Sequence, residues 1–225
     1  MSLQGRTIVI TGGFGILGRA ASRLAMEQGA RVAILDIAPA PSEHKGPGRG
    51  GVDLTDQAAS EEAFSEIATQ CSRIDALLNI AGGFAWQTVV DGDPATWDRM
   101  FKLNVKTTLT ASRAALPYLL KTQGAIVNVG SSAALKAGAG MGAYAASKQG
   151  VHKLTESMAG ELKGKVRVNA VLPSILDTPQ NRKDMPKTDP AIWVHPDDLA
   201  RVMLFLASPE AKAVTGALLP VTGQV

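Results

Sequence analysis

A tyrosine and a lysine stand one helical turn apart in the stretch AYAASK, residues 143–148. Side chains at this spacing share one face of a helix, so the Lys148 ammonium could act on the hydroxyl of Tyr144. A tyrosine with an ordinary pKa of about 10 is protonated at neutral pH, and a nearby cation lowers that pKa by about one to three units. The pair suits proton transfer, although ordinary helices also carry a half-buried tyrosine and a surface lysine at this spacing.

Four glycines lie in the stretch VITGGFGILGRA, between an apolar run and an amphipathic one. In an α/β sheet such a turn lets the backbone approach a pyrophosphate at the N-terminus of the next helix. The spacing departs from the general G-x-G-x-x-G pattern, and a tight turn without a ligand is the alternative. The dinucleotide contacts expected here come from Gly12, Phe14, Gly15, Ile16, Leu17 and Gly18.

Asp36 ends the second apolar run. At this point of a dinucleotide fold a carboxylate accepts hydrogen bonds from the adenine ribose hydroxyls. The same carboxylate would repel a 2′-phosphate, so we expect NAD as the cofactor and NADP is less favoured. The alternative is a solvated acid at the end of a strand.

The order of apolar and amphipathic stretches predicts the elements that position these residues. Short β-branched runs are typical of strands buried on both faces, and stretches with helical spacing lie between them. The alternation predicts an α/β fold, a single doubly wound domain over 1–225 with about seven parallel strands and six connecting helices on both faces. The predicted strands are 6–11, 31–36, 74–81, 124–131, 166–173 and 217–221, with a weaker one near 51–54. The predicted helices are 16–28, 56–71, 94–120, 142–162 and 196–207, with Asp56 and Asp197 as cap or first-turn acids.

Two stretches break this pattern. Residues 38–51 are rich in proline and glycine and should form a surface loop. Residues 173–190 should form a loop or short helix over the carboxyl ends of the strands, where open α/β sheets bind ligands.

Composition excludes several classes of protein. Hydrophobic residues make up 45% and charged residues 19%, which excludes a disordered chain. The net charge is +3 with scattered basic residues, so we expect no nucleic-acid partner. The chain has one cysteine, Cys71, so no intrachain disulfide can form. No other candidate metal ligand stands with Cys71 in the sequence. Because no long apolar run or signal-peptide pattern occurs, we expect a cytoplasmic protein with no metal and no membrane partner.

The chain resembles the short-chain dehydrogenase/reductase family over nearly its whole length. The match rests on the glycine turn, on NIAGG at 79–83, and on Asn104, Ser131, Tyr144 and Lys148, which fall at the spacings of the family's catalytic tetrad. The resemblance implies a Rossmann fold with strand order 3-2-1-4-5-6-7. It also implies cofactor contacts from Asp53, Leu54, Asn79, Ala81, Gly82, Tyr144, Lys148, Pro173, Ile175 and Thr178.

The expected chemistry is reduction of a carbonyl, or oxidation of an alcohol, which needs a proton donor or acceptor at the substrate oxygen. Tyr144 is expected to be the general acid and base. Lys148 would lower its pKa and hold the nicotinamide ribose, and Ser131 would hydrogen-bond the substrate oxygen. By resemblance, Asn104 would organise a water linked to Lys148.

These residues predict an NAD(H)-dependent oxidoreductase that transfers hydride between nicotinamide and a small carbonyl or alcohol substrate. The run LDTPQNRKDMP, residues 176–186, is similar to a segment of dihydropteridine reductases, so an NADH-dependent pteridine reductase is an alternative. A non-catalytic protein that senses NAD is a third hypothesis. Members of the resembled family commonly form homodimers or homotetramers through helices that correspond to 94–120 and 142–162.

Overall fold

The computed structural model describes residues 2–224 and contains a parallel sheet of seven strands. The strands lie in the order β3-β2-β1-β4-β5-β6-β7, which confirms the predicted α/β doubly wound topology and its order. They are β1 (Thr7–Thr11), β2 (Arg31–Leu35), β3 (Gly48–Arg49), β4 (Ala76–Asn79), β5 (Ala125–Val129), β6 (Arg167–Pro173) and β7 (Leu218–Val221).

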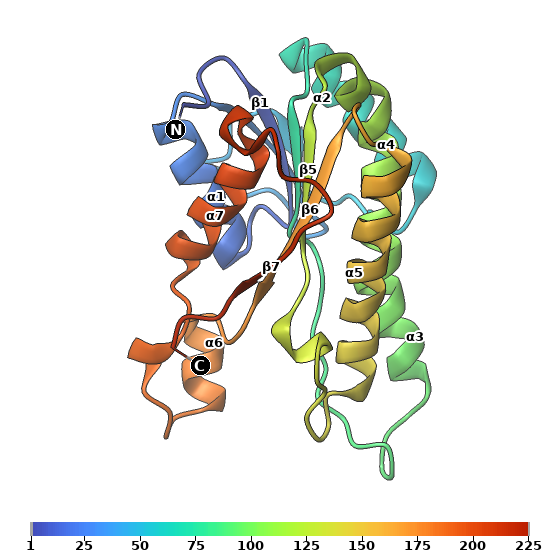
Figure 1. Ribbon diagram of the computed structural model, residues 1–225, viewed down its shortest axis with the longest axis vertical. Helices are drawn as coiled ribbons and strands as arrows, with labels where there is room; N and C mark the ends of the chain where they lie inside the picture. Colours follow the sequence, from blue (N-terminus) through green and yellow to red (C-terminus); the bar gives the residue numbers. More distant parts are fainter. Residues whose placement is uncertain (1, 225) are drawn as a thin grey trace.

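Helices cover both faces of this sheet (Figure 1). Helices α1 and α7 bury one apolar layer against it, and α2, α4 and α5 bury the other. Successive side chains of β1 alternate between the layers: Ile8 and Ile10 face α1, whereas Val9 faces α2. The main helices are α1 (Ile16–Glu27), α2 (Gln57–Cys71), α3 (Ala95–Phe101), α4 (Thr107–Thr122), α5 (Gly142–Glu161), α6 (Pro179–Asp184) and α7 (Pro196–Ala207). The shorter turns are η2 (Ser132–Ala134), η3 (Pro190–Ile192) and η4 (Pro209–Ala211).

The edge strand lies earlier than the sequence predicts. Gly48 and Arg49 form β3 and pair with Ile34 and Leu35, so the predicted strand at 51–54 is wrong. Residues 52 and 54 instead bury their apolar side chains in the layer under α2. Their alternation therefore reflects packing beneath a helix rather than a place in the sheet.

The predicted helix 94–120 is divided into three parts. Five π-helical residues, η1 (Lys102–Lys106), join α3 to α4 and place Asn104 in the middle of the irregular turn. Single π turns of this kind frequently occur at functional sites.

The helix starts follow local capping chemistry. The carboxylate of Asp56 accepts the Ala59 N–H at 3.0 Å and caps α2, as predicted. At α7, Asp197 lies in the first turn, and the imidazole of His195 accepts its N–H at 3.2 Å. Helix α6 lies within the predicted loop 173–190. No helix within residues 2–224 is long and apolar enough to span a membrane.

Candidate active site

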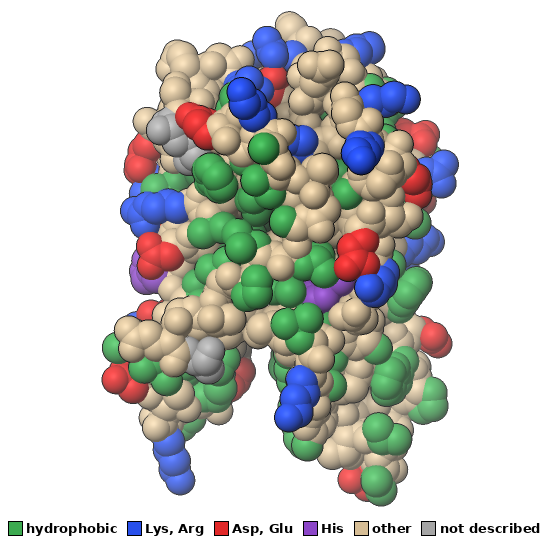
Figure 2. Space-filling model, in the orientation of Figure 1, with side chains coloured by type: hydrophobic (Ala, Val, Ile, Leu, Met, Phe, Trp, Pro, Cys, Tyr) green, Lys and Arg blue, Asp and Glu red, His purple; other side chains and the backbone are tan. Residues whose placement is uncertain are grey.

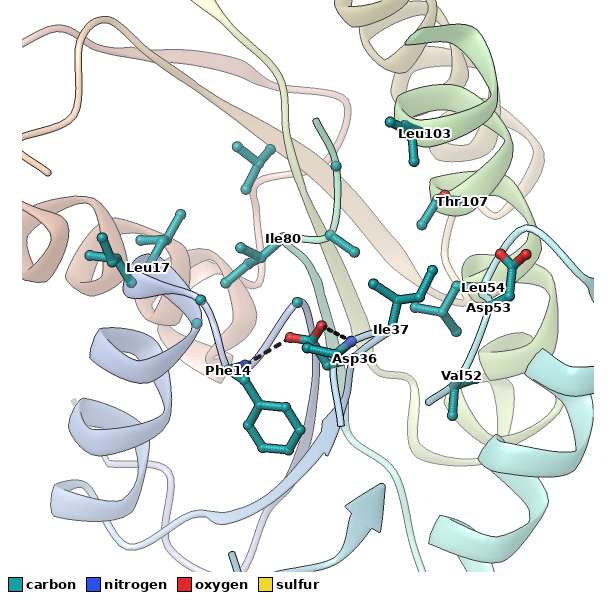
Figure 3. Close-up of a pocket in the computed structure, with 18 of the residues that line it drawn as sticks. Phe14, Leu17, Asp36, Ile37, Val52, Asp53, Leu54, Ile80, Leu103 and Thr107 are labelled. Carbon is teal, nitrogen blue, oxygen red and sulfur yellow. Dashed lines mark hydrogen bonds between the residues drawn. The ribbon is translucent and has the colours of Figure 1, made fainter. Parts of the chain in front are cut away.

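A cavity of about 550 Å³ opens where β1, β2 and β4 end (Figure 3). This volume lies in the range of small-molecule sites. The predicted cofactor residues that line it are Gly12, Phe14, Gly15, Ile16, Leu17, Gly18, Asp36, Asp53, Leu54, Ala81 and Gly82. Most of the predicted adenine and pyrophosphate contacts therefore share one cavity.

The turn after β1 presents bare backbone to this cavity. Gly12 has a φ of +65°, and a Cβ there would lie 2.9 Å from the Ala81 nitrogen. A Cβ at Gly18 would overlap the Gly12 carbonyl. Gly15 precedes α1 and no side chain caps that helix, so its N-terminal N–H groups can receive an anion.

Asp36 fixes the glycine turn as well as lining the cavity. Its Oδ2 accepts the Phe14 N–H at 2.9 Å and its Oδ1 accepts the Ala38 N–H at 3.0 Å (Figure 3). Each carboxylate oxygen has a further lone pair. Asp36 can therefore accept a ribose hydroxyl without releasing the turn.

Asp53 lies beside Leu54 at the far side of the cavity from Phe14 (Figure 3). The Thr55 side chain and backbone N–H both donate to its carboxylate, and these hydrogen bonds hold the pKa of Asp53 below its ordinary value. The backbone bond measures 2.9 Å. Asp53 therefore presents an ionised, oriented carboxylate.

Ser131 and Tyr144 come together between the end of β5 and the start of α5. Burial raises the pKa of Tyr144, and a hydrogen bond with the Ser131 side chain partly offsets the increase. The Ser131 Oγ also accepts the Ala133 N–H at 3.2 Å, which orients it at the start of η2. A substrate oxygen could meet both hydroxyls here.

Lys148 is buried, and its ammonium donates to the Val129 carbonyl at 2.8 Å. Burial lowers the pKa of Lys148 to about 8. Burial outweighs the other influences on Tyr144 and raises its pKa. The expectation that Lys148 lowers that pKa stays a prediction. A Cβ at Gly82 would lie 3.5 Å from Lys148 Nζ, so the ammonium stands next to the cavity lining.

Asn104 is fully buried and ties the segment after β4 to α5. Its Oδ1 accepts the Gly83 N–H at 3.0 Å, and its Nδ2 donates to the Gly83 carbonyl at 3.0 Å and to Ser147 Oγ at 2.9 Å. Ser147 Oγ in turn donates to the Tyr144 carbonyl at 2.7 Å. The Asn104 side chain thus holds backbone that surrounds Tyr144, and its expected link to a water stays a prediction.

His152, which the sequence did not single out, lies directly behind Ser131. Its imidazole is fully buried, and Nε2 accepts the Ser131 N–H at 3.2 Å while Nδ1 faces Gln149 Oε1 at 3.1 Å. The imidazole is therefore neutral, with its hydrogen on Nδ1. Burial and the charge of Lys148 both lower the pKa of His152. Its position one helical turn after Lys148 was the available signal.

Six predicted cofactor residues lie outside the cavity lining: Tyr144 and Lys148, described above, and four others. Asn79 Nδ2 donates to Ser112 Oγ at 3.0 Å and to Asn128 Oδ1 at 2.9 Å, so its amide joins β4 to α4 and β5. Thr178 caps α6 and accepts the Asn181 N–H at 3.1 Å. The Ile175 carbonyl accepts the Val194 N–H at 2.9 Å, and Pro173 ends β6.

Other cavity residues were not predicted, because they are apolar or act through backbone. They are Ile37, Ala38, Val52, Thr55, Ile80, Leu103, Thr107, Val129 and Leu176. Among residues 2–224, no cluster of three or more histidine, cysteine or acidic side chains could hold a metal ion. The cavity volume, the bare glycine turn, the uncapped helix and the Asp36 carboxylate all fit a dinucleotide.

Comparison with known proteins identifies the family. The family model described as short chain dehydrogenase matches residues 6–189. Meso-2,3-butanediol dehydrogenase of Serratia marcescens is 35% identical over 239 residues, which cover 99% of this chain and 95% of that protein. Two solved structures are also similar: ligand-free aldohexose dehydrogenase of Thermoplasma acidophilum (TM-score 0.90, 28% identity, 99% and 94% of the chains) and carveol dehydrogenase of Mycobacterium avium in complex with NAD (TM-score 0.86, 26% identity, 98% and 97%). These matches do not show the dihydropteridine reductase branch, but the chain belongs to the short-chain dehydrogenase/reductase family of oxidoreductases.

Proposed function

We propose that this protein is an NAD(H)-dependent oxidoreductase that transfers hydride between nicotinamide and a small carbonyl or alcohol, with Tyr144 as the general acid and base. The observation that carries the proposal is the juxtaposition of the Ser131 side chain and the half-buried Tyr144 hydroxyl, one helical turn from Lys148. Burial keeps the Tyr144 proton in place until an oxygen that develops negative charge takes it.

Different residues would bind the different chemical groups of NAD. Gly12, Gly15 and the N-terminus of α1 would hold the pyrophosphate, and Asp36 would accept the ribose hydroxyls. When bound, NADH supplies the hydride for the carbonyl carbon. NAD is proposed over NADP because a 2′-phosphate would meet the Asp36 carboxylate.

The chain's own residues manage the proton. In reduction, the Tyr144 hydroxyl gives its proton to the substrate oxygen, while the Ser131 hydroxyl donates a hydrogen bond to the same oxygen. The Lys148 ammonium, with a pKa of about 8, is charged at neutral pH and stabilises the tyrosinate that remains. In alcohol oxidation the tyrosinate takes the proton back.

Two alternatives make different demands on Ser131 and Tyr144. A pteridine reductase, favoured by the run at 176–186, should reduce quinonoid dihydropterin with NADH at a rate unaffected by Ser131→Ala. The position of the Ser131 side chain next to the Tyr144 hydroxyl favours the carbonyl enzyme instead. A sensor of NAD would bind the cofactor and show no turnover with any carbonyl or alcohol.

The proposal extends to assembly. We expect the single domain 1–225 to form a homodimer or homotetramer through the long helices α4 and α5. Phe101 and Leu109, exposed on α3 and α4, support an apolar contact there. Light scattering that returns a monomer would contradict this part of the proposal.

Replacement of Tyr144 by phenylalanine tests the catalytic assignment. We expect Tyr144→Phe to bind NADH within about twofold of the wild type and to lose about 10²-fold or more in kcat, because only the proton donor is removed. Tyr118→Phe is the matched control, since Tyr118 is the other tyrosine and lies under Lys121 on α4. A Tyr144→Phe enzyme with wild-type kcat would contradict the assignment of Tyr144 as the general acid and base.

A further inference from the structure

The two segments that flank Tyr144 carry almost no charge. Residues 80–90 and 131–147 contain one lysine, Lys136, and no arginine, histidine, aspartate or glutamate. Apart from the exposed Lys136 and the buried Lys148, which donates to the Val129 carbonyl, a charged group brought to this side of the site would lose hydration without meeting a charged partner. The composition therefore favours contacts with a neutral molecule.

An exposed aromatic ring lies against the acid itself. The Phe84 ring meets the Tyr144 ring edge to face, with 5.0 Å between their centroids and 73° between their planes. Phe84 follows Gly83, whose N–H and carbonyl are both bound by Asn104, so the backbone that carries the ring is fixed. Phe84 nevertheless leaves 59% of its surface exposed, an apolar face next to the reacting hydroxyl.

A second exposed ring, two residues further along the chain, is held by the loop before α5. The Trp86 indole N–H donates to the Ala139 carbonyl at 3.1 Å, and the Gln87 N–H donates to the Gly140 carbonyl at 2.8 Å. Gly140 has a φ of +73°, and a Cβ there would overlap the indole. Trp86 is thereby held against the loop that leads into α5, yet 62% of its surface is exposed.

On the opposite lobe, the arginine of α6 is already paired with an acid. Figure 2 shows a hollow between two lobes at the lower end of the molecule, with the α6 segment on one side and the segments around Tyr144 on the other. On α6, both guanidinium contacts of Arg182 go to Asp177, at 2.6 and 2.7 Å. That arginine is already paired and does not favour an anionic substrate.

We propose that the substrate is a neutral ketone, or the corresponding secondary alcohol, whose reacting carbon carries an aromatic or alicyclic ring that packs on Phe84 and Trp86. The inference rests on the proposed function and adds the substrate class. A ring placed there removes apolar surface of both side chains from water, at about 25 cal/mol per Å². The carbonyl of the same molecule reaches Ser131 and Tyr144, because Phe84 touches the Tyr144 ring.

Three ketones assayed with NADH test the substrate class: acetophenone, 4-acetylbenzoate and butanone. We expect the wild-type kcat/KM to be about tenfold or more higher for acetophenone than for either other ketone, because one carries an unpaired charge and the other lacks the ring. Phe84→Ala should lower kcat/KM for acetophenone about tenfold, mainly by raising KM. Its kcat/KM for butanone should stay within about twofold of the wild-type value. Phe84→Leu keeps an apolar side chain, so its kcat/KM for acetophenone should lie between those of the wild type and Phe84→Ala.

Phe205→Ala is the control, since Phe205 is an exposed phenylalanine on α7, across the sheet from α5. Phe205→Ala should leave kcat/KM for all three ketones unchanged. Equal turnover of 4-acetylbenzoate and acetophenone, or equal losses for all ketones in Phe84→Ala, would overturn the inference.

Binding separates failure of this inference from failure of the proposed function. Saturation-transfer NMR with acetophenone and the NADH-loaded protein should detect binding in the wild type and Phe205→Ala and lose it in Phe84→Ala. An enzyme that reduces butanone but does not bind acetophenone retains the proposed function and refutes the substrate class. A protein that binds acetophenone through Phe84 but reduces no ketone retains the binding site and refutes the proposed function.

Discussion

Ser131 is held from behind by a buried neutral imidazole. The contact joins the segment that follows β5 to α5, and Gly130 leaves no room for a side chain between them, since a Cβ there would overlap the His152 ring. Removing the acceptor would leave the Ser131 N–H buried without a partner, at a cost of about 1–3 kcal/mol. The orientation of the Ser131 hydroxyl therefore depends on a residue that does not touch the substrate.

A double-mutant cycle tests this positioning role. We expect His152→Leu to lower kcat about tenfold with little change in KM, and His152→Gln, whose amide oxygen can reach the same N–H, to restore most of it. In a Ser131→Ala background, His152→Leu should have no further effect on kcat, because the two residues act as a unit. An equal loss in both backgrounds would mean that His152 only supports the fold.

The burial of Lys148 predicts how stability varies with pH. The pKa of Lys148 falls from 10.5 to about 8 on folding, so the folded chain holds fewer protons than the unfolded chain between these values. Below pH 8 the ammonium is charged in both states and its burial opposes folding in full. As pH rises from 8 to 10.5, this contribution is relieved and the free energy of unfolding increases.

Urea unfolding across that pH interval measures the effect. Lys148→Met should be more stable than the wild type below pH 8, and the difference should shrink by up to about 3 kcal/mol toward pH 10.5. Lys153→Met is the control, because Lys153 lies on the same helix with its side chain exposed beside Glu156. A pH-independent difference for Lys148→Met would contradict the buried charge.

At the scale of elements, the glycine turn between β1 and α1 is a junction rather than a flexible loop. Gly12 packs against the backbone of Ala81, which follows β4, and Asp36 after β2 holds the Phe14 N–H. Three neighbouring strands thus meet at one turn. Any cofactor seated there contacts the ends of all three.

Substitution of two glycines with positive φ distinguishes the cost of backbone strain from an effect on cofactor binding. Gly5, at φ +70°, has no atom within 4 Å of a built Cβ, whereas a Cβ at Gly12 meets Ala81. Gly5→Ala should cost about 1–2 kcal/mol in the free energy of unfolding and leave NADH affinity unchanged. Gly12→Ala should also weaken NADH binding by about tenfold or more in a fluorescence titration, because the turn must move. Equal NADH affinities in the two variants would show that the turn is not part of the cofactor site.

At the scale of the molecule, the cavity couples cofactor binding to stability. A ligand that binds only the folded chain at 100 times its Kd adds about 2.7 kcal/mol to the free energy of unfolding. For a chain of this size that corresponds to roughly 5–10 °C in Tm. We expect NADH to raise Tm by this amount and NADPH, at equal concentration, to raise it less.

Asp36→Asn provides the matched variant. It keeps an oxygen acceptor and removes the charge, so the difference between the NADH and NADPH shifts should narrow. A wild-type Tm that rises as much with NADPH as with NADH would refute the proposed preference for NAD.

Spacing along the chain predicts six of the seven strands, most of the helices and the residue types of the site. Runs such as TIVIT predict strands because β-branched side chains packed on both faces give a local, continuous apolar signal. Short-range spacing within one element or one connection also made three features recognisable: the glycine turn, Asp36, and the pair Tyr144 and Lys148. The predicted adenine side of the site accordingly lines one cavity.

The tertiary structure alone decided which groups meet. Lys148 binds Val129, Ser131 binds His152 and Asn104 binds Gly83, and each contact joins segments that are far apart in the chain. Residues 52 and 54 have the alternation of a strand but pack under α2. Burial also raises the pKa of Tyr144, because loss of water around the phenol outweighs the hydrogen bond with Ser131. Periodicity is local, whereas desolvation and partner choice depend on how the helices pack on the sheet.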